Sequence, residues 1–261
     1  MKNIRILAVL NFVAFLVTVV VNQLAVALPL NGQNTGEISD LYPNLFVPAG
    51  VTFSIWGVIY LYLLAYSVFQ LITAFSSNSD QPFSKAIGIW FVVSSIANCA
   101  WIFAWHYLLP GLSLIIMLVL LYSLIQIYLR LYAVREEASK AVKWIVYPAF
   151  NIYLGWITVA TIANTTAVLV HFGWEGGFLS PVAWTMLMIA IATGMGTYFG
   201  FFRRNIPYTL VIIWALFGIY LARMQEVVPG AKGIIYAALL GMIICTVSIA
   251  SRLFPRTAKA S

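Results

Sequence analysis

The sequence predicts an all-α integral membrane protein, built as a polytopic bundle of about eight transmembrane helices. Of its 261 residues, 63% are hydrophobic and only 8% are charged, whereas a soluble globular chain is about 25% charged. The apolar residues fall in continuous runs of roughly 17–25 residues, the length that crosses about 30 Å of hydrocarbon. Strands of a membrane barrel would instead alternate over about ten residues, so the runs predict helices.

Short segments rich in proline, glycine and polar residues separate the eight predicted spans. Because most of these connections are short, we expect sequential spans to pack antiparallel. The first connection is longer, about twenty residues through Asn31, Glu37, Asp40 and Pro43, and a long loop of this kind is often a lid. The spans cover residues 4–28, 52–75, 84–107, 111–134, 143–170, 181–202, 206–222 and 230–252.

The first span resembles a signal peptide, because Lys2 and Arg5 precede an apolar run. That run, residues 6–28, is longer than the 7–15 residues of a signal h-region. We therefore expect it to stay in the protein as a helix. One face of this helix carries three polar residues, Asn11, Thr18 and Asn22.

Positive charge predicts the orientation of the bundle, because Lys and Arg collect on the cytoplasmic side. With eight spans and a cytoplasmic N-terminus, only Arg223 and Lys232 would lie outside. The net charge of +7 then has a topological explanation, and we expect no nucleic-acid partner. The sequence favours a bacterial inner (plasma) membrane, with both termini cytoplasmic. The inside set is Lys2, Arg5, Lys85, Arg130, Arg135, Lys140, Lys143, Arg203, Arg204, Arg252, Arg256 and Lys259.

Aromatic and amide side chains form stripes on the second, third and fifth spans. Lipid-facing positions favour Leu, Ile, Val and Phe, so polar side chains should turn inward. Two interpretations remain open: hydrogen-bonded helix packing, or a pocket for a planar apolar ligand, which Trp and Tyr suit by their flat surfaces and single donors. The stripes are Phe53, Trp56, Tyr60 and Ser67; Ser94, Asn98, Trp101 and Trp105; and Tyr153, Trp156, Ala160 and Asn164.

Residues typical of catalysis are missing from the spans. His106 and His171 stand at helix ends, and all six lysines lie at ends or in loops. Proton relays and charge-coupled pumps need buried ionisable groups, so the pattern disfavours them. Cys99 and Cys245 lie in apolar runs and are expected to be small buried hydrophobes. The sequence predicts no catalytic constellation, no metal site and no required cofactor.

Three segments together resemble the TspO/MBR family of tryptophan-rich sensory proteins, which includes the mitochondrial translocator protein. PAGVTFSIWGVIY (48–60), SIANCAWIFAWHYLLPGLSL (95–114) and YLGWITVATIAN (153–164) are similar to its second, third and fifth helices. The resemblance implies a five-helix bundle over residues 1–172, capped by the first loop, that binds porphyrins and in some members sterols. The implied ligand-binding residues, with Phe53 added from its stripe, are Pro48, Phe53, Trp56, Tyr60, Asn98, Trp101, Trp156 and Asn164.

The chain also departs from that family. Leu112 and Ile116 stand where the family usually has Trp and Asp, and Ile152 replaces a proline. Residues 167–172 lack the Tyr and the basic residue of a sterol pattern, which disfavours sterol binding there.

Residues 173–261 add three helices that the five-helix pattern lacks. Their small-residue faces favour close helix contacts, which leaves docking onto the bundle and homodimer formation both open. These faces are Gly196-x-x-x-Gly200 and Gly233-x-x-x-Ala237-x-x-x-Gly241.

The leading functional hypothesis is a membrane protein that binds, and transports or senses, a hydrophobic planar ligand such as a tetrapyrrole. One alternative is a permease or scaffold subunit that works with a membrane partner, and the added helices are its support. A further alternative is a membrane enzyme acting on a porphyrin or isoprenoid, although the spans offer few titratable groups for it.

Overall fold

The computed structural model describes residues 2–28, 30–76, 81–174, 177–225 and 230–251, and within these ranges the chain is helical without β-strands. It forms two compact units. Unit 1 comprises Met1–Pro43 and Phe53–Trp174, and unit 2 comprises Asn44–Thr52 and Glu175–Ser261. The second half of the first long loop thus belongs with the C-terminal helices.

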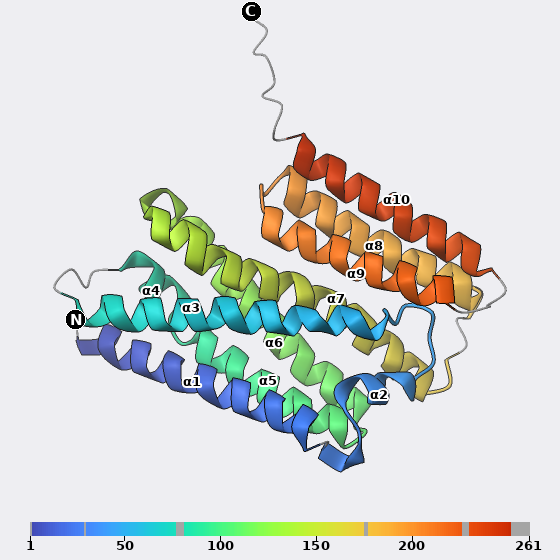
Figure 1. The fold of residues 1–261 in the computed structure, drawn as a ribbon, viewed down its shortest axis with the longest axis horizontal. Coiled ribbons are helices and arrows are strands. Elements are labelled where there is room, and N and C mark those ends of the chain that lie inside the picture. Colours follow the sequence, from blue (N-terminus) through green and yellow to red (C-terminus); the bar gives the residue numbers. More distant parts are fainter. Residues whose placement is uncertain (1, 29, 77–80, 175–176, 226–229, 252–261) are drawn as a thin grey trace, which may run out of the picture. The chain divides into compact units, whose positions relative to one another are not determined.

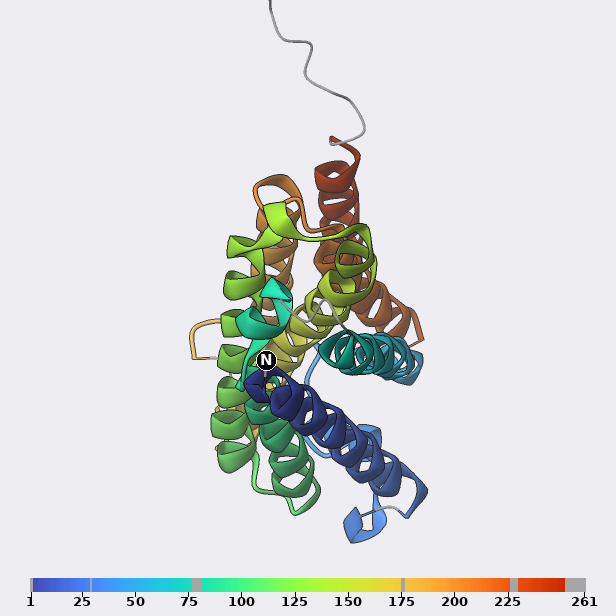
Figure 2. The same ribbon diagram turned by 90° about the vertical axis from the view of Figure 1, so that its left-hand side faces the viewer.

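Unit 1 holds the five long helical regions expected in residues 1–172. Helix α1 packs against α3 and α5, while α6 packs against α5 and α7, and α3 also contacts α7. Successive long helices run in opposite directions (Figures 1 and 2). Its α-helices are α1 (Lys2–Ala27), α2 (Thr35–Asp40), α3 (Ile55–Phe75), α4 (Pro82–Ile87), α5 (Trp90–His106), α6 (Pro110–Ala133) and α7 (Tyr147–His171).

The third predicted span is divided into two helices. Gly88, between α4 and α5, has φ 54° and ψ −141°, a conformation that glycine adopts readily because it has no Cβ. Among the described residues, seven helices are long and apolar enough to cross a membrane. Helix α5, with 17 residues, is the main part of the third predicted span, the one that is not among these seven.

Helix α7 begins with a π-helical turn over Val142–Val146. Pro148 is the second residue of α7, and a proline has no N–H to donate to the carbonyl four residues earlier, which its ring also crowds. The widened turn accommodates that missing hydrogen bond.

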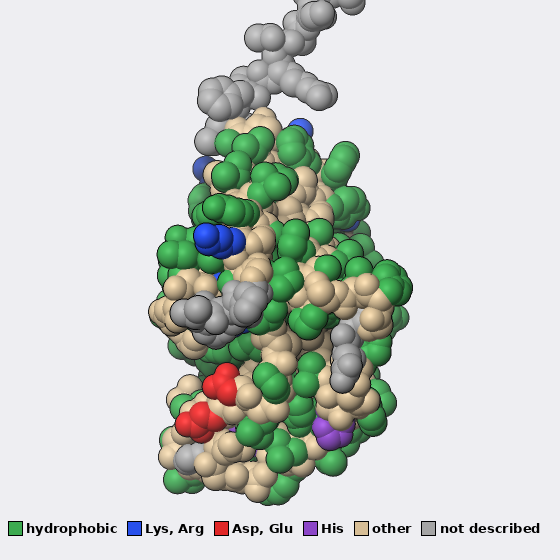
Figure 3. Space-filling view, turned by 90° about the vertical axis from the view of Figure 1, so that its right-hand side faces the viewer, with side chains coloured by type: hydrophobic (Ala, Val, Ile, Leu, Met, Phe, Trp, Pro, Cys, Tyr) green, Lys and Arg blue, Asp and Glu red, His purple; other side chains and the backbone are tan. Residues whose placement is uncertain are grey.

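Helix α1 has larger apolar side chains on its exposed face than on much of its buried face. Ala8, Asn11 and Ala25 are fully buried. The exposed side chains include Ile6, Val9, Leu10, Val13, Leu16, Val17, Val20 and Leu24. Hydrophobic side chains also cover much of the surface in Figure 3. Such a surface suits hydrocarbon as its solvent, and the protein is an integral membrane protein.

Charge in unit 1 separates along the helices. Because its long helices alternate in direction, every Lys and Arg of its described residues lies at the end that holds the N-terminus of α1. Acidic Glu37 and Asp40 are exposed on α2 at the other end, and Figure 3 shows acidic side chains on that face. The cytoplasmic side stays a prediction, and Arg252, Arg256 and Lys259 lie outside the described residues.

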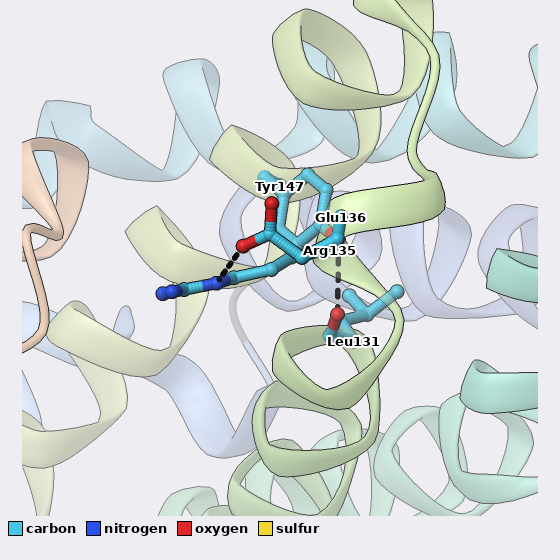
Figure 4. A network of polar contacts seen from close by, with 4 residues as sticks. All are labelled: Leu131, Arg135, Glu136 and Tyr147. Atoms are coloured by element: carbon cyan, nitrogen blue, oxygen red, sulfur yellow. Dashed lines mark hydrogen bonds and ion pairs between the residues drawn. The ribbon is translucent and has the colours of Figure 1, made fainter.

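Polar contacts join α6 to α7 at the basic end of unit 1. The Tyr147 hydroxyl donates to the Leu131 carbonyl at 2.9 Å. Arg135 Nε donates to Glu136 Oε1 at 3.0 Å (Figure 4). The Tyr147 hydrogen bond links the two helices, and the Arg135–Glu136 pair lies within the turn between them.

Unit 2 contains α8 (Pro181–Phe201), α9 (Ile206–Gln225) and α10 (Ala231–Ala250), which pack against one another. Its glycines lie at the helix contacts: Gly196 faces Cys245 and Ile212, and Gly200 faces Ser248 and Thr209.

Gly241 of α10 faces Thr193 of α8 and Leu216 of α9, and Gly233 faces Met186 of α8. A Cβ at Gly196, Gly200 or Gly241 would collide with its neighbours. The small-residue faces of α8 and α10 therefore serve the internal packing of this unit.

Candidate functional site

Five rings from α3 and α7, with the turn before α3, form an aromatic cluster inside unit 1: Phe53, Trp56, Tyr60, Tyr153 and Trp156. Trp56 stacks on Tyr60 with ring centroids 5.4 Å apart. It meets Tyr153 at 6.0 Å and Trp156 at 6.4 Å, in both cases edge to face. Phe53 meets the Trp156 ring at 5.8 Å. The cluster offers flat apolar surfaces in different orientations.

The rings of the cluster differ in exposure. Tyr153 and Trp156 are buried at 2% and 4% exposure, whereas Phe53, Trp56 and Tyr60 are half-buried. The α3 side of the cluster is thus its accessible side.

A buried amide pair adjoins the cluster. Asn22 Nδ2 of α1 donates to Asn98 Oδ1 of α5 at 2.6 Å. The other side of the Asn98 amide faces the Tyr153 hydroxyl, yet Asn98 Nδ2 makes no direct hydrogen bond among the described residues. Asn98 is fully buried, and buried donors are usually paired. This N–H group, beside the Tyr153 hydroxyl, could donate to a polar group of a ligand.

Trp101 and Asn164 form a separate polar group on α5, α6 and α7. Trp101 Nε1 donates to Asn164 Oδ1 at 3.1 Å, and the Asn164 amide also bonds with the Ser113 hydroxyl. The Trp101 ring stacks on Trp105 at 5.9 Å. No ring contact joins Trp101 to Trp56 or Trp156 in the described part of the chain. The predicted site residues therefore divide into two groups within unit 1.

The first half of the long loop lies over the ends of α5 and α7, as a lid would. His106 is fully buried and its Nδ1 lies 3.1 Å from the Leu30 carbonyl. A carbonyl only accepts, so Nδ1 donates this hydrogen bond. Nε2 lies 3.0 Å from the Thr35 hydroxyl and bonds with it. Asn31 Nδ2 donates to the His106 carbonyl at 3.0 Å.

Aromatic contacts complete this attachment. Trp105 Nε1 donates to the Thr35 carbonyl at 3.2 Å. Tyr42 packs on Trp105 at 5.6 Å and on His171 at 6.0 Å. Burial raises the pKa of the Tyr42 phenol above its ordinary value. Residues 30–43 are referred to below as the lid.

Pro48 is the one predicted site residue outside unit 1. It belongs to the loop half in unit 2, where its Cβ lies close to Gly218 of α9.

Several buried polar residues were not assigned to the site from the sequence, although they contact or resemble the residues that were assigned to it. Asn22 and Tyr153 were visible on polar stripes but were not assigned to the site. A second amide network was missed: Asn11 Nδ2 donates to Tyr66 Oη at 3.1 Å and to Gln70 Oε1 at 3.0 Å. Gln70 is fully buried, and a glutamine in the middle of an apolar span was its signal.

The side chains of the site also bear on whether it could hold a metal ion. No three His, Cys, Asp or Glu side chains of the described residues come together where they could hold a metal ion. The aromatic cluster and the Asn98 amide supply flat apolar surface and hydrogen bonding.

Helices that expose large apolar side chains, and that enclose aromatic rings and amides, define a membrane protein of the ligand-binding or sensing class. A family model described as TSPO-like protein matches residues 8–251, and the chain belongs to this family. The matched range continues through α8, α9 and α10, the helices that the five-helix pattern lacks. Neither a curated protein nor a solved structure matches the chain.

Proposed function

We propose that unit 1 binds a hydrophobic planar ligand of the tetrapyrrole class and serves to sense, carry or transport it. The observation that carries this proposal is the aromatic cluster beside the unpaired Asn98 Nδ2. A porphyrin ring matches the flat faces of Trp56 and Trp156, and its polar substituents match an amide donor.

A porphyrin titration tests this proposal. Adding protoporphyrin IX to the detergent-purified protein should quench Trp emission in a saturable way. Trp156→Phe should weaken binding about three- to tenfold, because an aromatic contact contributes about 0.5–1.5 kcal/mol. Trp101→Phe should weaken it less, because Trp101 lies outside the aromatic cluster.

Trp144→Phe is the matched control, because Trp144 is 77% exposed at the opposite, basic end of unit 1. Its affinity should equal that of the wild type. Absence of saturable quenching for every tetrapyrrole tried would contradict the proposal.

The alternative of a scaffold subunit receives no support from the small-residue faces. Gly196, Gly200 and Gly241 pack within unit 2, so these glycines need no membrane partner or second copy to explain them.

We also propose that the protein lies in a bacterial inner membrane with both termini cytoplasmic. The support is the separation of charge in unit 1, where the basic end would face the cytoplasm and the lid with its acidic residues would face outside.

A further inference from the structure

The second half of the long loop is held by α9 of unit 2. The indole N–H of Trp214 donates to the Thr52 carbonyl at 2.9 Å, and the Ala49 N–H donates to the Gly218 carbonyl at 2.9 Å. Ala49 and Thr52 are also joined by a hydrogen bond of 2.9 Å between the Thr52 N–H and the Ala49 carbonyl. Two bonds from one helix thus hold a turn of four residues.

Glycine at position 218 allows this close approach. A Cβ there would collide with the Thr52 side chain and lie 2.9 Å from Pro48 Cβ. Thr52 is fully buried, so its side chain has no open space into which to move. The close contact between the loop and α9 therefore depends on two residues, the buried Thr52 of the loop and Gly218 of α9.

The same turn continues directly into the aromatic cluster. Residues Gly50–Ser54 form one 3₁₀ helix, and α3 begins at Ile55. Thr52 is bound by Trp214 of unit 2, and the next residue, Phe53, packs on Trp156 of unit 1. Trp56 follows within the first turn of α3. Thr52 and Phe53 are thus consecutive residues of one 3₁₀ helix that leads into α3.

We propose that the C-terminal helices control the ligand site through this turn, with Trp214 and Gly218 as positioning residues that fix where α3 begins. The added helices thereby set the position of Phe53 and Trp56, while the lid is held independently by α5 and α7. The part of this inference that concerns ligand affinity rests on the proposed function, whereas the part that concerns backbone order does not.

Hydrogen–deuterium exchange of the full-length, ligand-free protein in detergent tests the positioning. Trp214→Phe keeps an aromatic ring and removes the donor to Thr52, and Gly218→Ala inserts a Cβ into the contact. Each should speed exchange at residues 49–60 by about five- to tenfold, the loss expected for one hydrogen bond. The melting temperature should change little in Trp214→Phe.

Two matched variants serve as controls. Trp144→Phe removes an exposed indole, and Gly194→Ala adds a Cβ where no atom lies within 4 Å. Both should exchange like the wild type. Unchanged exchange at residues 49–60 in Trp214→Phe would overturn the inference. Faster exchange confined to residues 49–52 would also overturn it, because the effect would not reach α3.

The same variants separate this inference from the proposed function. If the wild type binds protoporphyrin IX, followed by the shift of the porphyrin absorbance band, Trp214→Phe should weaken binding about three- to tenfold. If Trp214→Phe exchanges faster in α3 but binds protoporphyrin IX as tightly as the wild type, the proposal that unit 2 controls the ligand site is wrong. If the wild type binds no tetrapyrrole, the proposed function fails, while the exchange result still decides whether unit 2 positions α3.

Discussion

Buried amides are the most informative single residues of this protein. Asn98, Asn164, Asn11 and Gln70 are each buried at 3% exposure or less, and each bonds to a side chain on another helix. The hydrocarbon core of a bilayer has no water to hydrogen-bond a polar group, so the partner must come from the protein. Each amide therefore specifies which helices must lie next to one another.

Removing the amide of Asn164 should destabilise unit 1. Asn164→Ala leaves the Trp101 indole N–H and the Ser113 hydroxyl without their shared partner, at an expected loss of about 1–3 kcal/mol. Unfolding by sodium dodecyl sulfate titration from a mild detergent measures the change. Thr246→Val is the control, because Thr246 is exposed and bonds only within α10. Equal stability of both variants would contradict this prediction.

Replacing His106 should release the lid. His106→Phe keeps a ring but removes both ring hydrogen bonds, to the Leu30 carbonyl and the Thr35 hydroxyl. Hydrogen exchange at residues 30–43 should rise at least about fivefold. Tyr107→Phe changes the exposed neighbouring residue and should leave exchange unchanged. Wild-type protection in His106→Phe would show that the remaining contacts, from Asn31, Trp105 and Tyr42, are enough to hold the lid.

The helical elements agree closely with the spans predicted from hydrophobic runs, because length and apolar composition alone decide what crosses a bilayer. The inward stripe on α5 was predicted correctly: Ser94, Asn98, Trp101 and Trp105 are all buried. The break in the third span was missed. Gly88 lies in an apolar sequence with no other turn residue beside it, so hydropathy gave no signal for its unusual backbone conformation.

That break makes Gly88 sensitive to substitution. Gly88→Ala should destabilise the protein by about 1–3 kcal/mol, because a Cβ strains the backbone at φ 54°. Gly194→Ala, in open space within α8, should be neutral or stabilising by up to about 1 kcal/mol, since alanine favours a helix more than glycine does. The same detergent unfolding titration compares the two. Similar effects at both positions would contradict the role of Gly88.

At the scale of the whole molecule, residues far apart in sequence were the hardest to predict. Pro48 matched a family motif beside Trp56, yet it packs against Gly218, about 170 residues later. Composition could not reveal that partner, because a glycine in an apolar helix looks the same whether it meets a loop, a helix or lipid. Likewise, the small-residue faces predicted close packing correctly but not the helices they would meet.

Chemical labelling of intact cells checks the proposed orientation. Glu37→Cys places a thiol on exposed α2, and Glu136→Cys places one in the exposed turn at the basic end of unit 1. A membrane-impermeant maleimide should label the first variant in intact cells and the second only after permeabilisation. The unaltered protein, with Cys99 and Cys245 inside its spans, gives the background. The reverse pattern would invert the topology.

The amides of α1 also bear on how the protein is made. Asn11 depends on Tyr66 and Gln70 of α3, and Asn22 depends on Asn98 of α5. During synthesis the first helix therefore enters the bilayer before either partner exists. Its polar face must stay shielded, by the insertion machinery or by water, until α3 and α5 emerge from the ribosome. We therefore expect α1 to form its polar contacts only after α3 and α5 have been synthesised.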